Sequence, residues 1–133
     1  MNINRRNFLF GSAAAATLAG CATNKVGLRD LKSGEKLRAA MIGYGIQMRT
    51  ALIPQFLGNG AAAGVEKMLE IVAVCDCDKG RAAAGAKQVN NAYGTQNCKA
   101  VADFRDVIKD PTIDVVCIGA PDHWHAYMSV EAM

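Results

Sequence analysis

A short apolar run that ends in two glycines limits what this chain can fold into more than any other part of its sequence. Residues 37–48 read Leu-Arg-Ala-Ala-Met-Ile-Gly-Tyr-Gly-Ile-Gln-Met. A strand, a glycine turn and a helix start follow in the order that a dinucleotide-binding βαβ unit requires. Gly43 would permit the tight turn. Gly45 would let the backbone approach a pyrophosphate, which the N–H groups of the helix N-terminus then bind.

Met48 departs from this glycine fingerprint, because a third glycine normally lets the helix pack closely on the strand. A strand-to-helix turn without a ligand is the simpler interpretation of Gly-x-Gly taken alone. The candidate cofactor-binding residues of this stretch are Gly43, Gly45, Ile46 and Gln47.

Apolar runs alternate with segments of helical periodicity, which predicts an α/β fold built on a parallel sheet. Pro54 is expected to kink or shorten the first helix, since proline has no N–H group. The last strand is apolar almost throughout and is predicted to be the most clearly buried one. Strands are expected at 36–42, 70–75, 98–102 and 113–118, and helices at 47–57, 65–69, 79–91 and from Asp103, as the cap, to Asp110.

An acidic residue, Asp76, ends the second strand. In a dinucleotide fold an acid at this point accepts hydrogen bonds from the adenosine ribose and repels a 2′-phosphate, so NAD is favoured over NADP. Asp78 is a competing candidate, and a solvated turn carboxylate is the simpler interpretation of either acid. Lys79 and Arg81 follow closely enough to hold a 2′-phosphate, so NADP stays an alternative.

The cysteines and histidines do not predict a metal site. Cys75, Cys77 and Cys117 fall in apolar strand-like runs, where a buried thiol behaves as a small hydrophobe. Zinc requires paired ligands at finger-like spacing, which Cys75-Asp-Cys77 does not supply. His123 and His125 could share a metal, but no third ligand is evident, so no metal is expected.

The chain is too short for a nucleotide domain and a substrate domain together, because its 133 residues suffice for one modest domain. We therefore expect the substrate domain to be absent. The formal charge of +3 would fall to +1 without Arg5 and Arg6, so the composition predicts no nucleic-acid partner.

The first 21 residues resemble an export signal. Asn-Arg-Arg-Asn-Phe-Leu at 4–9 is similar to a twin-arginine signal, and the apolar stretch after it is too short to span a bilayer. Leu-Ala-Gly-Cys at 18–21 is similar to the lipobox at which bacterial lipoproteins are cleaved and lipidated, here on Cys21. An uncleaved anchor or a disordered leader is the alternative.

Three regions are therefore expected: a signal at 1–21, a linker at 22–36 and a dinucleotide-binding domain at 37–133. The protein would leave the cytoplasm by the twin-arginine route and lie in the periplasm or cell envelope, attached to the membrane by lipid.

Several motifs in order resemble the N-terminal domain of the Gfo/Idh/MocA oxidoreductase family, and the resemblance covers 37–133. The motifs are Ile-Gly-Tyr-Gly at 42–45, Val-Ala-Val-Cys-Asp at 72–76, Asp-Phe-Arg at 103–105 with Asp110-Pro111, and Ile-Asp-Val-Val-Cys-Ile-Gly-Ala-Pro-Asp-His-Trp-His at 113–125. The resemblance implies a Rossmann-type parallel sheet with helices on both faces, incomplete at its C-terminal end, that binds NAD or NADP.

The resemblance also implies roles for the segment after the last strand. Pro121 and Asp122 would line the cofactor pocket from a loop at 121–125, and His125 matches a histidine that the family places near nicotinamide and substrate. Asp122 has an alternative role as the cap of the final helix. Ala120 replaces the Thr or Ser that is common before the proline. The family's Glu-Lys-Pro segment with its lysine is not in this sequence, so the catalytic residue is unknown.

The full enzyme, as the resemblance implies it, passes hydride between NAD and a sugar or polyol hydroxyl and can be a homo-oligomer. An NAD-dependent glycosidase of the same family is the first alternative, and a non-catalytic envelope lipoprotein or remnant is the second. The 133-residue chain alone is expected to be inactive and poorly folded, because the edge of its last strand would be exposed.

The export hypothesis makes a prediction about covalent structure. The leader should be cut before Cys21 and the cysteine should carry acyl chains, which would hold the protein on the envelope. Intact-mass analysis of protein purified from its native membrane tests this. A mass that includes unprocessed Met1, or an unmodified Cys21, would contradict it.

Overall fold

The computed structural model describes residues 30–60 and 64–133, and the predicted leader lies outside this part of the chain. The elements follow in the order β1 (Leu37–Ile42), the π-helix η1 (Met48–Leu52), α2 (Ile53–Phe56), α3 (Val65–Met68), β2 (Leu69–Cys75), α4 (Lys79–Tyr93), β3 (Lys99–Val101), α5 (Phe104–Lys109), β4 (Val115–Ile118) and α6 (Asp122–Glu131). None of the described helices combines the length and apolar character needed to cross a bilayer.

One sheet holds these strands in the order β3-β2-β1-β4. Every neighbouring pair is parallel, so the carboxyl ends of all four strands meet at the same edge. Ile42, the last residue of β1, lies between Cys75 of β2 and Ile118 of β4. The predicted strand order along the chain and the parallel sheet are confirmed.

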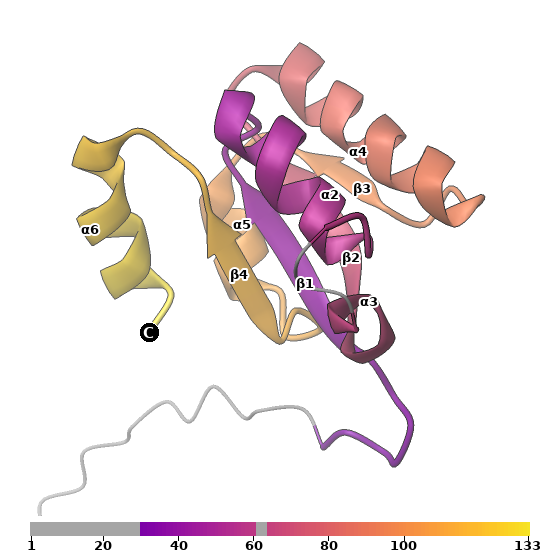
Figure 1. Cartoon of the computed structure of the whole chain (residues 1–133). Coiled ribbons are helices and arrows are strands. Elements are labelled where there is room, and N and C mark those ends of the chain that lie inside the picture. The colour runs from indigo at the N-terminus through magenta and orange to yellow at the C-terminus, as the bar shows by residue number, and fades with distance from the viewer. Residues whose placement is uncertain (1–29, 61–63) are drawn as a thin grey trace, which may run out of the picture.

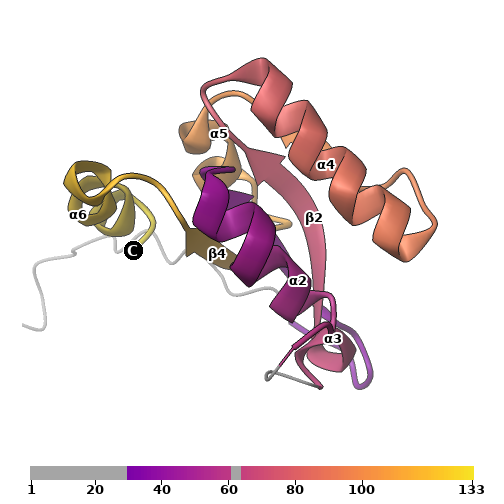
Figure 2. The same ribbon diagram turned by 45° about the horizontal axis from the view of Figure 1, so that its top comes forward.

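Helices cover both faces of the sheet (Figures 1 and 2), which confirms the predicted fold class. Alternate residues of β1 enter different cores, because side chains along a strand point to opposite faces. Ala39 and Met41 pack under η1, α2 and α4, whereas Ala40 and Ile42 pack with Phe104 and Val107 of α5.

A bulge interrupts the pairing of β1 with β2. Ala39 pairs with Ile71, but Ala40 pairs with Ala73, so Val72 has no partner on β1. Ile71 consequently belongs to the core under α4, while Ala73, two residues later, belongs to the core over α5.

The first helix accommodates Pro54 without ending before it. Helical backbone runs over 46–56, and the N–H of Ile53 donates to the carbonyl of Met48, five residues back. This wider π-turn, η1, leads directly into α2, where Pro54 stands in the first turn. Proline therefore changes the winding of the helix rather than its length.

The burial predicted for the last strand is wrong. All four residues of β4 are only partly buried, whereas Ala40, Met41 and Val74 in β1 and β2 are inaccessible to solvent. The reason is position, because β4 pairs with β1 on one side and forms an edge of the described sheet. The strand also begins at Val115 rather than at residue 113.

The burial predicted for Cys77 is wrong as well. Cys75 is buried at the end of β2, but the chain turns immediately afterwards and leaves Cys77 exposed. Cys98, which the strand pattern placed at the start of the third strand, precedes β3 and is buried. Its backbone N–H and carbonyl both bond the side-chain amide of Asn90 in α4, at 2.9 and 3.1 Å.

Gly85 brings α4 close to the sheet. A Cβ at this position would lie 2.5 Å from Cγ1 of Val74 and 2.8 Å from Cδ2 of Tyr44, which is closer than such atoms can approach. The helix face with the smallest residues, Ala82, Gly85 and Ala86, is the buried one. Tyr44, from the glycine turn, occupies the space that Gly85 leaves.

Substitution of Gly85 by Ala should therefore lower the free energy of unfolding. Alanine favours a helix over glycine by about 1 kcal/mol, but overpacking of this kind costs about 1–3 kcal/mol. Urea titration followed by circular dichroism measures the balance. Ala84→Gly on the exposed side of α4 is the control, because it reports the helix propensity alone. A net gain in stability for Gly85→Ala would show that the packing tolerates a Cβ.

Candidate functional site

A cavity of about 710 Å³ opens at the carboxyl edge of the sheet. Its wall comes from the turn after β1, the end of β2, the first turns of α4 and α5, the segment that joins β4 to α6, and α6 itself. The lining residues are Ile42, Gly43, Gly45, Ile46, Gln47, Cys75, Asp76, Cys77, Arg81, Ala102, Asp103, Phe104, Arg105, Gly119, Ala120, Pro121, Trp124 and Met128. Six of the eight predicted cofactor-binding residues are therefore brought together, and Asp122 and His125 are not in the wall.

Gly43 is required by both conformation and space. Its φ of +89° lies in the left-handed region that favours glycine, and a Cβ would lie 2.8 Å from the Ala120 nitrogen and 2.9 Å from the Gly119 carbonyl. The Gly43 N–H donates to the Cys75 carbonyl at 2.7 Å, and that of Gly119 donates to the Ile42 carbonyl at 2.7 Å. The turn is thus hydrogen-bonded into the ends of β2 and β4.

Gly45 directly precedes the helix and faces open space. The nearest atom to a Cβ at Gly45 would be the Gly119 carbonyl oxygen, 4.0 Å away. The Arg49 N–H donates to the Gly45 carbonyl at 3.1 Å, which is the first hydrogen bond of the helix. The N–H groups of the residues between Gly45 and Arg49 therefore have no acceptor within the helix. Such groups, at the positive end of a helix, suit an anion.

Met48, at the position of the missing third glycine, is completely buried in the core. A Cβ on Gly119 would lie 2.8 Å from the Met48 Cε atom. The space that close packing needs is therefore provided by a glycine at the end of β4 rather than by one on the helix.

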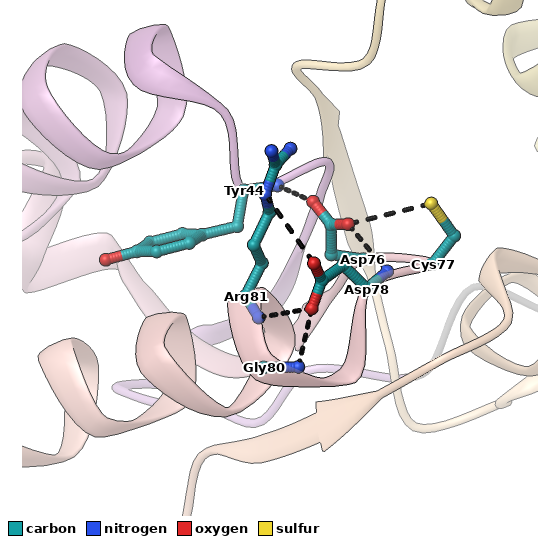
Figure 3. Close-up of polar contacts among 6 residues, drawn as sticks. All are labelled: Tyr44, Asp76, Cys77, Asp78, Gly80 and Arg81. Carbon is teal, nitrogen blue, oxygen red and sulfur yellow. Dashed lines mark hydrogen bonds and ion pairs between the residues drawn. The ribbon is translucent and has the colours of Figure 1, made fainter.

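Asp76 braces the glycine turn from the end of β2 (Figure 3). One carboxylate oxygen accepts the Tyr44 N–H at 2.8 Å and the other accepts the Asp78 N–H at 2.9 Å. Its side chain is nearly buried, with 8% of the residue exposed. The oxygen that accepts the Asp78 N–H also accepts the Cys77 thiol at 3.7 Å, whereas the oxygen bonded by Tyr44 keeps a second lone pair that can accept a hydroxyl from the cavity.

Asp78, the competing acid, caps a helix. Its Oδ1 accepts the N–H groups of Gly80 and Arg81 at 2.8 and 3.1 Å, which fixes the start of α4 (Figure 3). Its other oxygen lies 4.0 Å from Arg81 Nε in an exposed ion pair. Asp76 lines the cavity and Asp78 does not.

The segment at 121–125 is not a loop, contrary to prediction. Pro121 occupies the N-cap position of α6, and the helix begins at Asp122, which is therefore not the cap. Proline, with φ held near its observed −58°, suits a helix start. Trp124 and Met128, four residues apart on one helix face, line the cavity, whereas His125 does not. Asp122, His123 and His125 are all exposed.

Arg105 and two aromatic rings connect α5 to α6. The guanidinium lies 4.7 Å from the Phe104 ring centroid and 3.3 Å from the Asp103 carboxylate. A hydrogen bond with the Tyr127 hydroxyl raises the pKa of Arg105 further above its usual value. The Phe104 and Tyr127 rings meet edge to face at 6.0 Å. The sequence predicted a helix start at 103–105 and a family motif there, but no signal in it predicted this contact with α6.

Burial raises the pKa of the two buried cysteine thiols, Cys75 and Cys98. Burial, with a smaller contribution from Asp103 and Asp76, raises the pKa of Cys75 to about 12. Burial likewise raises the pKa of Cys98 to about 11. Among residues 30–60 and 64–133, no cluster of three or more potential ligands for a metal is present.

Residues 37–133 match a family model described as an oxidoreductase family with an NAD-binding Rossmann fold. The chain is 29% identical over 144 residues to the glycosyl hydrolase family 109 protein 2 of Shewanella sp. (strain ANA-3). It is 29% identical over 146 residues to a glycosyl hydrolase family 109 protein of Shewanella baltica (strain OS155 / ATCC BAA-1091). These matches take in 98% and 99% of this chain but only 31% of each relative.

Two solved structures share the fold. The myo-inositol dehydrogenase from Lactobacillus casei, in complex with NAD(H) and myo-inositol, has a TM-score of 0.57 at 23% identity. A levoglucosan dehydrogenase in complex with NADH and levoglucosan has a TM-score of 0.50 at 22% identity. Each comparison takes in 74% of this chain and 25% of the other protein.

The thiols should differ sharply in reactivity. Because the thiolate is the reactive form, iodoacetamide at pH 8 should label the exposed Cys77 first and leave Cys75 and Cys98 untouched. A pKa of about 12 leaves a thiolate fraction on the order of 10⁻⁴ for Cys75 at that pH. Time-resolved peptide mass mapping measures each rate, with denatured protein as the control. Equal rates for Cys75 and Cys77 in the native protein would contradict the structure.

Proposed function

Because this chain belongs to the Gfo/Idh/MocA oxidoreductase family and carries its NAD-binding Rossmann fold, we propose that the cavity at the carboxyl edge of the sheet holds the dinucleotide. In the whole protein, bound NAD would supply the hydride acceptor or donor for a sugar or polyol hydroxyl. The observation that carries the proposal is the Gly43 turn, where a Cβ would meet the backbone at 2.8 Å.

The residues present fit a dinucleotide. The backbone at Gly43 and Gly45 presents no side chain to the cavity, and the N–H groups of Ile46 and Gln47 lie at the helix start. A pyrophosphate would bind there without displacing any side chain, since its charge is met by N–H groups. Asp76 lies in the same wall, and its Oδ2, which accepts only the Tyr44 N–H among the described residues, has a lone pair available to a ribose hydroxyl.

NAD suits this site better than NADP. The Asp76 carboxylate would repel a 2′-phosphate, and the nearby Arg81 already lies beside the Asp78 carboxylate. An exposed ion pair of this kind is weak, so Arg81 is the residue through which NADP would bind if it did.

The end of β4 and α6 closes the other side of the proposed site. Pro121, Trp124 and Met128 give that wall an apolar character, which would exclude water from a bound nicotinamide. Asp122 and His125, on the exposed surface of α6, are proposed to meet the substrate or the rest of the protein rather than the cofactor.

Glycosidic bond cleavage is the second candidate function. The relatives named as glycosyl hydrolases match over 98–99% of this chain, which supports a glycosidase that uses NAD for transient oxidation. Oxidation and hydrolysis of a sugar would use the same dinucleotide site.

Homo-oligomer formation by the whole protein is a further part of the proposal.

Export and lipid attachment complete the proposed function. The support is the twin-arginine pattern at 4–9 and the lipobox pattern ending at Cys21. Because the twin-arginine route carries folded proteins, the dinucleotide would be bound before export, and the site would have to retain it.

Titration with NADH tests the proposal. Trp124, the single tryptophan of the chain, lines the cavity, so bound NADH should quench its emission by energy transfer. Gly43→Ala should weaken binding at least tenfold, because about 1.4 kcal/mol of strain or displacement at the turn suffices. Gly34→Ala is the matched control, since Gly34 also has a positive φ of 86° but has nothing within 4 Å.

Three results would count against this assignment. Absence of quenching in the wild type would reject dinucleotide binding in this cavity. Equal losses in both glycine variants would assign the effect to backbone strain alone. Equal affinity for NADH and NADPH would mean that Asp76 does not meet the ribose.

A further inference from the structure

One carbonyl in the helix after the glycine turn lacks a backbone donor. The Ile53 N–H is bonded to the Met48 carbonyl in the π-helical pattern. The Arg49 carbonyl would take the next N–H along the chain, but residue 54 is proline and has none. A donor for Arg49 must therefore come from outside the helix.

Gln88 of α4 supplies it. The Gln88 Nε2 donates to the Arg49 carbonyl at 3.1 Å, and its Oε1 accepts the Tyr44 hydroxyl at 2.8 Å. Chemistry fixes the orientation of this amide, because a backbone carbonyl can only accept. A single side chain thus links η1 to the residue between the two turn glycines.

Tyr44 is held at three points. Its N–H donates to Asp76 at 2.8 Å, its ring fills the space left by Gly85, and its hydroxyl bonds Gln88. In Figure 3 the ring extends away from the Asp76 carboxylate, toward the helices. Tyr44 does not line the cavity, whereas the flanking Gly43 and Gly45 do.

We propose that Tyr44 and Gln88 are positioning residues for the dinucleotide turn. They hold the turn and the start of η1 in one arrangement against α4, so that the N–H groups are oriented before an anion arrives. Preorganised groups bind a ligand more tightly, because no conformational entropy is lost in ordering them when the ligand binds. This inference rests on the proposed function, since it assigns the turn to the pyrophosphate.

A double-mutant cycle tests the inference. Tyr44→Phe removes only the hydroxyl, and Gln88→Met keeps the side-chain size while removing both hydrogen-bonding groups. Each variant should weaken NADH binding about 3- to 10-fold, the effect of one neutral hydrogen bond. The double variant should bind NADH with the same affinity as the single variant that binds it less tightly, because both changes break the same chain of hydrogen bonds.

Competing ligands separate positioning from general loosening. ADP-ribose, which contains the pyrophosphate, should lose the same factor as NADH when it competes for the site. Adenosine, which has no phosphate, should displace NADH with the same dissociation constant for adenosine in the wild type and in both variants.

Tyr93→Phe is the matched control. Tyr93 ends the same helix, and its hydroxyl accepts the Ile71 N–H at 3.2 Å, away from the cavity. This variant should lose stability in a urea titration and keep its NADH affinity. All NADH titrations are made without urea, on variants that circular dichroism has first been used to check for folding.

The outcomes are distinct. If the wild type binds NADH and Tyr44→Phe and Gln88→Met bind it equally well, the positioning role is overturned and the proposed function stands. Multiplying effects in the double variant, or equal losses for adenosine, would also overturn it. If the wild type does not bind NADH, the proposed function fails and this inference fails with it.

Discussion

The site depends on the close approach of two backbones where the turn after β1 meets the end of β4. Neither Gly43 nor Gly119 has room for a Cβ, because one faces the Ala120 nitrogen and the other faces Met48 at 2.8 Å. A larger residue at Gly43 would push the turn away from the end of β4, and one at Gly119 would displace the Met48 side chain. The floor of the cavity would then be side chain, and the hydrogen-bonding groups of the backbone would be covered.

Much of the fold follows from the sequence, because local patterns decide it. Apolar runs with intervening helical periodicity were sufficient to predict the parallel sheet and α4, whose face of small residues is indeed buried. Burial of β4 was not predictable from its composition, since it depends on how many strands flank it. The π-turn was also not predictable, because a proline in the sequence indicates that one backbone hydrogen bond is missing but not which hydrogen-bonding pattern the helix adopts instead.

The candidate site was predictable where backbone conformation requires a residue type. Gly43 and Asp76 were predicted from their places after two strands, and both line the cavity. Trp124 and Met128 were not predicted as wall residues, because the resemblance placed the wall in a loop at 121–125, where the structure has the first turn of α6. The Tyr44–Gln88 contact joins residues 44 positions apart and has no local signal.

The bulge at Val72 allows β2 to change length without disturbing either end. Val72 has no partner on β1, and the side chains on its two sides already enter opposite cores. Deleting this single residue would restore a regular ladder and could leave Asp76 where it stands. A chain without this residue would keep the pairing at both ends of β2, and an alignment that ignored the bulge would place its residue equivalent to Asp76 one position out of step.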